Sequence, residues 1–137
     1  MRIAICGSLA FADKMISAKK ELSKLGHTAV FSKFADEFIG LTEDEKRKKN
    51  ERNFQIHDVI RAFWEEIKKS DAILVLNYDR KGIKYYIGGN TLMEIGFAHV
   101  LHKKIFLMNP IPKIEFYEQE IAATKPVILN EDLHKIA

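Results

Sequence analysis

Apolar residues form short uninterrupted runs along this chain, separated by longer stretches in which they recur at helical spacing. The runs at 3–6, 72–76 and 105–108 contain no charged residue, which is typical of parallel strands buried on both faces. Segments 28–31 and 126–129 complete a set of five predicted strands. The first run stops at a glycine and a serine, which favour a turn.

The segments between these strands predict helices. From about Ala12 to Gly26, apolar residues recur at helical spacing and the glycine ends the pattern as a C-cap residue does. Further helices are predicted from about 54 to 70, from about 91 to 101, and around 114–123. Alternating strands and helices predict a three-layer α/β fold with a parallel sheet. Five strands favour the flavodoxin-like strand order 2-1-3-4-5.

One stretch does not follow this alternation. Thr42 precedes a highly charged run that has almost no apolar face, and threonine is a good N-cap for a helix. A helix of this composition buries little apolar surface. We therefore predict a mobile excursion at about 35–52 that would serve as a lid.

Length and composition predict a single domain over residues 1–137, because 47% of the residues are hydrophobic and can fill one core. The net charge of +3 comes from 22 basic and 19 acidic residues. The basic run Lys46-Arg47-Lys48-Lys49 lies among acids, so the chain shows no concentrated basic face and we expect no nucleic-acid partner. No stretch approaches the roughly 20 apolar residues of a membrane span, so we expect no membrane association.

The cysteine and histidine residues indicate which disulfides and metal sites to expect. Cys6 is the only cysteine and forms no internal disulfide, which fits a reducing, cytoplasmic location. His57, His99 and His102 show no ligand-like arrangement. We expect no metal site and no cofactor.

In a doubly wound sheet, ligands bind outside the carboxyl ends of the strands, where the strand order reverses between strands 1 and 3. The loop after the first strand begins with Gly7 and Ser8, whose hydroxyl and backbone N–H groups suit phosphate or form an ordinary turn. The loop after the third strand runs from 77 to 90. Asn77 and Asn109 end their strands and are placed either to bind a ligand or to form turns.

The most informative segment begins at Gly88, Gly89, Asn90 and Thr91 and continues to Glu94. Two glycines let the backbone approach a ligand closely, and the start of a helix supplies unpaired N–H groups. A second interpretation is a capping box, in which the glutamate only accepts the backbone N–H of the threonine three residues earlier. The sequence leaves both interpretations open.

A family resemblance rests on this segment. The pattern from Gly89 through Glu94 and Gly96 to Ala98, following the third predicted strand, resembles the signature of the nucleoside 2-deoxyribosyltransferase family. The first loop, Cys6-Gly7-Ser8, is similar to that of the 2-deoxynucleoside 5-phosphate N-hydrolase members. The resemblance covers most of the chain from residue 2 to about 129, and the middle excursion matches least.

The resemblance implies a flavodoxin-like fold, usually a homodimer or larger homo-oligomer, that cleaves or transfers the N-glycosidic bond of a (deoxy)nucleoside or its 5-phosphate. The family nucleophile matches Glu94, and a helix N-terminus would help to keep that carboxylate ionised. The implied partner is a small nucleoside or nucleotide. The expected binding residues are Gly7, Ser8, Asn77, Tyr86, Gly88, Gly89, Asn90, Thr91 and Asn109.

The chain also departs from the family pattern. The family aspartate about two helical turns before strand 3 is matched by Phe63, the strand 1 tyrosine by Ala4, and a first-loop arginine of some members by Ala10. Asp58 and Asp79 are possible substitutes for the missing acid, although each is also typical of a surface carboxylate. Tyr85 and Tyr86 would stack on a base or simply pack the loop.

Two alternatives to a glutamate-dependent N-glycosidase follow. The first is a non-catalytic nucleotide-binding protein that retains the pocket, which Phe63 would favour. The second is a phosphoribohydrolase of the cytokinin-activating kind, whose Gly-Gly-x-Gly-Thr-x-x-Glu signature residues 88–94 resemble in part. Here Asn90 directly precedes Thr91, so the third glycine of that signature is missing.

Overall fold

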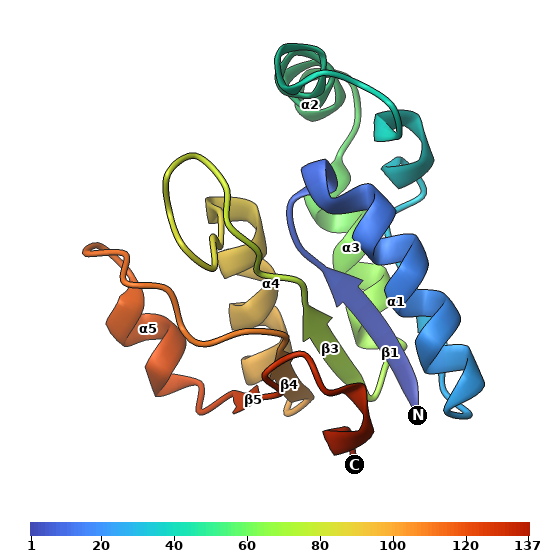
Figure 1. The fold of residues 1–137 in the computed structure, drawn as a ribbon, viewed down its shortest axis with the longest axis vertical. Coiled ribbons are helices and arrows are strands. Elements are labelled where there is room, and N and C mark those ends of the chain that lie inside the picture. Colours follow the sequence, from blue (N-terminus) through green and yellow to red (C-terminus); the bar gives the residue numbers. More distant parts are fainter.

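A five-stranded parallel sheet with helices on both sides forms the centre of the computed structural model, which describes residues 1–137 (Figure 1). The strands are β1 (Arg2–Cys6), β2 (Thr28–Val30), β3 (Ala72–Val75), β4 (Lys104–Leu107) and β5 (Val127–Ile128). They lie in the order β2-β1-β3-β4-β5, and every pair is parallel. The predicted three-layer architecture with strand order 2-1-3-4-5 is confirmed.

The sheet separates two apolar clusters. Successive residues of a strand point to opposite faces, so Leu74 belongs to the cluster beneath α1 (Ala12–Lys24), whereas Ile73 and Val75 belong to the other. The second cluster is closed by α3 (Val59–Lys68), α4 (Gly89–Val100) and α5 (Glu118–Ala123). All four residues of β3 are buried, which explains why this strand is apolar throughout.

Helix α1 ends where the sequence predicts. Gly26 has a φ of +88°, and the N–H of His27 donates to the carbonyl of Leu22 at 3.0 Å while the N–H of Gly26 donates to the carbonyl of Ser23 at 3.1 Å. These two bonds form a Schellman motif, which closes the helix and directs the chain into β2.

The predicted helix from about 54 to 70 is wrong at its start. The charged helix α2 (Glu43–Ile56) continues through Phe54, and the chain breaks at His57 before α3 begins. Asp58 is the N-cap of α3, its carboxylate accepting the N–H of Arg61 at 3.0 Å. This cap starts a new helix and leaves Phe54 and Ile56 exposed on α2 instead of on the apolar stripe of α3.

Helix α2 stands beyond the carboxyl ends of the strands and away from the sheet (Figure 1). Its predicted cap is confirmed, because Thr42 and Glu45 form a capping box. Only Asn53 of this helix is buried. Polar contacts hold its first turns, among them a hydrogen bond of 3.1 Å from Lys46 Nζ to the carbonyl of Ala10 in the 3-10 turn η1 (Leu9–Phe11).

Candidate active site

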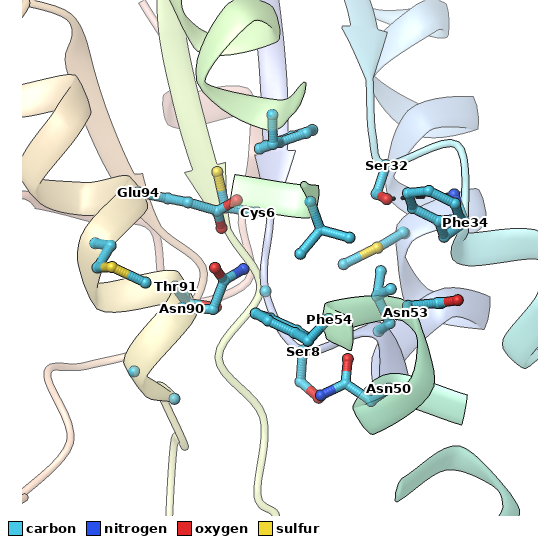
Figure 2. Close-up of a pocket in the computed structure, with 18 of the residues that line it drawn as sticks. Cys6, Ser8, Ser32, Phe34, Asn50, Asn53, Phe54, Asn90, Thr91 and Glu94 are labelled. Atoms are coloured by element: carbon cyan, nitrogen blue, oxygen red, sulfur yellow. Dashed lines mark hydrogen bonds between the residues drawn. The ribbon is translucent and has the colours of Figure 1, made fainter. Parts of the chain in front are cut away.

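A cavity of about 420 Å³ lies beyond the carboxyl end of β1, between the loops that follow β1 and β3. This is the point at which the strand order reverses, where open α/β sheets bind ligands. Helices α1, α2, α3 and α4 and the segment after β2, with Ser32 and Phe34, contribute to the remaining walls (Figure 2). The volume lies within the range of cavities that bind small molecules.

Most of the predicted site residues come together here. The cavity is lined by Gly7, Ser8, Tyr86, Gly88, Gly89, Asn90, Thr91 and Glu94. They come from the loop after β1 and from the end of the loop after β3 with the start of α4, and the parallel sheet brings these two parts of the chain to the same edge.

Two glycines at the cavity leave room for neighbouring groups. Gly7 has a φ of +146°, and a Cβ at this position would lie 2.9 Å from the carbonyl oxygen of Leu76. A Cβ at Gly88 would lie 2.9 Å from the hydroxyl oxygen of Tyr86. A side chain at Gly7 would therefore displace the backbone just after β3, and one at Gly88 would displace the hydroxyl end of Tyr86, which lines the cavity.

The capping interpretation of Glu94 is wrong. Gly88 is the N-cap of α4 and no side chain caps the helix, because the helix begins two residues earlier than predicted. Glu94 consequently lies beyond the first turn and is only 6% exposed. Its carboxylate points toward the end of β1, close to Cys6 and to the amide of Asn90 (Figure 2).

Burial governs the ionisation of Glu94. Removal of the carboxylate from water raises its pKa to about 8. The expectation that a helix N-terminus would keep this group ionised is therefore not met, since the group lies inside the helix and away from the first N–H groups. Burial, and secondarily the Glu94 carboxylate, raise the pKa of the Cys6 thiol. The thiol is thus neutral and a poor nucleophile.

Asn90 presents an unsatisfied acceptor beside Glu94. Its side-chain Oδ1 is buried and accepts no hydrogen bond, although buried polar atoms almost always have a partner. Asn90 lines the cavity with Thr91, whose side chain is also buried. A ligand hydroxyl that donates to Asn90 would satisfy this oxygen and lie next to the Glu94 carboxylate.

Phe63 also lines the cavity and is buried. This residue stands at the position that the family resemblance assigns to an aspartate. Glu94 is the only carboxylate among the residues that line the cavity. The site therefore contains one buried acid and no second carboxyl group to act as its partner.

The two acids considered as substitutes lie outside the cavity. Asp58 is occupied as the N-cap of α3 and also pairs with Arg61. The Asp79 carboxylate accepts the backbone N–H of Tyr85 at 3.0 Å and organises the exposed loop after β3. Both carboxylates make local contacts typical of turns and caps.

Asn77 and Asn109 are likewise not part of the cavity wall. Both are buried at the ends of β3 and β4 and bind each other. Of the two interpretations of these asparagines, ligand binding and turn formation, their contacts match turn formation.

Several cavity residues were not predicted. Arg80 and Lys81 enter from the loop after β3, and Asn50, Asn53 and Phe54 enter from α2. The three α2 residues share one helix face at spacings of three and four. They are among the few uncharged positions of that helix. This break in the charged pattern could have identified the helix face that lines the cavity.

Comparison with protein-family models, curated proteins and solved structures gave no match. No helix is both long enough and apolar enough to cross a membrane. No three or more His, Cys, Asp or Glu side chains gather in a group that could hold a metal ion.

Proposed function

We propose that this protein cleaves or transfers the N-glycosidic bond of a (deoxy)nucleoside or its 5-phosphate, with Glu94 as the nucleophile. The observation that carries the proposal is a single buried carboxylate that lines a cavity of ligand size at the switch point of the sheet. The resemblance of residues 89–98 to the deoxyribosyltransferase signature supports the same assignment.

The chemistry assigned to Glu94 follows that of retaining glycosidases. A carboxylate oxygen forms a bond to the anomeric carbon while the bond to the base nitrogen breaks. The base leaves with the electron pair of that bond and takes a proton from solvent. Water, or a second base in a transfer reaction, then attacks the same carbon, loses a proton to solvent and releases the Glu94 carboxylate.

The raised pKa of Glu94 affects both the fraction of this residue that is ionised and its reactivity. With a pKa of about 8, only about a tenth of Glu94 is ionised at pH 7. The ionised fraction is poorly solvated, which makes it more reactive toward a developing oxocarbenium ion than a hydrated carboxylate. Asn90, with its free acceptor next to Glu94, would orient a hydroxyl of the sugar.

The test is incubation with ribo- and deoxyribonucleosides and their monophosphates, followed by detection of released base. Glu94→Gln keeps the size of the side chain but forms no glycosyl ester, so it should bind substrate and release no base. A glutamine variant as active as the wild type would exclude Glu94 as the nucleophile.

A second candidate function is binding without catalysis. The observation that favours it is Phe63, an apolar wall where the resemblance assigns an acid. In that case neither the wild type nor Glu94→Gln would release base, and both would show a rise in melting temperature with a nucleotide.

A further inference from the structure

Arg80 is an unusual feature of the cavity wall. Its side chain is only 16% exposed, and its Nε is buried without any hydrogen-bond partner. Nη1 donates to the hydroxyl of Ser8 at 3.2 Å, which joins the loop after β3 to the loop after β1. The guanidinium carbon lies 5.8 Å from the centre of the Tyr86 ring.

The positive charge of Arg80 is poorly compensated within the protein. Its one carboxylate contact is with Glu43 of α2, at 3.4 Å, and that side chain is 70% exposed. A long contact with an exposed carboxylate contributes little. By contrast, Arg47 makes two ion pairs of 2.9 Å on the surface of α2. A cation that is largely removed from water and has an unsatisfied donor costs free energy unless something else neutralises it.

The charges that line the cavity also favour an anionic ligand. Arg80 and Lys81 are the only cationic side chains that line it, and Glu94 is the only anionic one. A carboxylate as buried as Glu94 favours its neutral form. The cavity wall therefore carries excess positive charge, and an anionic ligand would complement it.

We propose that Arg80 and Ser8 form a phosphate subsite, so that the substrate of this cavity is a nucleoside 5-monophosphate in preference to a nucleoside. The guanidinium supplies a planar set of donors that matches phosphate oxygens, and Ser8 adds a hydroxyl. Bound phosphate would satisfy the free Nε and replace Glu43 as the partner of Arg80. This inference rests on the proposed function for the identity of the sugar and base.

The experiment is a binding measurement that requires no turnover. The Glu94→Gln protein is titrated with 2-deoxyribose 5-phosphate, with 2-deoxyribose and with inorganic phosphate, and binding is followed by NMR. We expect the sugar phosphate to bind at least about tenfold more tightly than the neutral sugar. Inorganic phosphate should compete for the same subsite but bind more weakly than the sugar phosphate.

Arg80→Ala should reduce the preference for the phosphorylated sugar to within about twofold. Arg80→Lys should retain part of it, because a lysine keeps the charge but not the planar set of donors. Arg61→Ala is the matched control, since this arginine is exposed on α3 and outside the cavity. It should leave all three affinities unchanged.

Three results would overturn the subsite: equal affinity for the two sugars, no binding of either, or a preference that survives Arg80→Ala in a folded protein. If inorganic phosphate binds as tightly as the sugar phosphate, the site is a site for free phosphate, and the proposal that its ligand is a nucleoside monophosphate is rejected. Binding through Arg80 without any base release by the wild type would reject the proposed catalysis and keep the subsite. If the wild type releases base at the same rate with and without a 5-phosphate on the substrate, and Arg80→Ala does not change that rate, the subsite is rejected and the proposed catalysis is kept.

Discussion

Asn77 and Asn109 bind each other through both side chains and main chains. The Oδ1 of Asn77 accepts the backbone N–H of Asn109 at 2.9 Å, and the Nδ2 of Asn109 donates to the carbonyl of Asn77 at 3.1 Å. The Nδ2 of Asn77 also donates to the carbonyls of Asn109 and Pro110. Both amide hydrogens of Asn77 are thus engaged, and the pair fixes the start of the loop that carries Arg80.

Asn77→Ala should therefore destabilise the protein without directly removing a ligand contact. The substitution leaves the buried N–H of Asn109 without its acceptor, and we expect a loss of about 2–4 kcal/mol in the free energy of unfolding. Urea denaturation measures this loss, with the exposed Gln119→Ala as the control. A change below about 0.5 kcal/mol would contradict the structural role.

Glu94 should make the stability of the protein depend on pH. The folded protein keeps the Glu94 proton up to a pKa of about 8, whereas an ordinary glutamate loses it near 4.5. Between these values the folded state binds more protons than the unfolded state, so stability falls as pH rises. The loss from this group reaches roughly 4 kcal/mol at pH 8.

Glu94→Gln removes that dependence. The variant should be more stable than the wild type at pH 8, and the two should converge toward pH 4.5. Urea denaturation at intervals across this range provides the measurement, with Glu21→Gln, an exposed glutamate of α1, as the control that should run parallel to the wild type. Parallel curves for Glu94→Gln would mean that Glu94 is ionised in the folded state.

The pH dependence of base release separates two roles for Glu94. A nucleophile must be ionised, so kcat/KM should rise about tenfold per pH unit below the pKa of about 8 and level off above it. A general acid must be protonated, so its activity would be constant at low pH and fall above pH 8. The second profile would reject the nucleophilic role and still leave Glu94 catalytic.

The parts of this structure that the sequence predicted are those fixed by local pattern. The apolar run 72–76 predicted a buried central strand, and parallel topology then brought Ser8 and Glu94 to one cavity. The start of α4 was misplaced because two glycines do not specify where a helix begins, and that error supported a capping box at Thr91. Arg80 was missed because only the tertiary structure removes its side chain from water.

Helix α2 should open more readily than the sheet. It buries only Asn53, and polar contacts such as those of Lys46 with Ala10 and of Glu43 with Arg80 tie it to the rest of the protein. We expect its amides to exchange with deuterium at least about tenfold faster than those of β3. A bound nucleoside monophosphate should slow this exchange, because Asn50, Asn53 and Phe54 line the cavity.

Protection of α2 equal to that of β3 would contradict the interpretation of this helix as a lid. Helix α5 provides a comparison within the same experiment, because it is short and exposed but does not line the cavity. A nucleotide that slowed exchange equally in α5 and α2 would indicate general stabilisation of the fold and not closure over the ligand.

Phe63 predicts how strongly the reaction should depend on the leaving group. With no second carboxyl group in the cavity wall, the departing base must take its proton from solvent, and a positioned general acid is ordinarily worth about 10² to 10⁴ in rate. A base that is already cationic needs no such proton. The protein should therefore release 7-methylguanine from its deoxynucleotide at least about 100-fold faster than guanine from the unmethylated nucleotide.

Two variants at position 63 test whether this preference comes from the missing acid. Phe63→Asp places a carboxyl group in the cavity wall, so it should raise the rate of guanine release and narrow the difference between the two substrates by about tenfold. It should also cost about 3 kcal/mol or more in stability, because a buried ring is lost. Phe63→Leu keeps an apolar wall and should retain the full preference for the methylated base. If Phe63→Leu narrows the difference as much as Phe63→Asp does, the preference arises from the shape of the cavity and not from the absence of an acid.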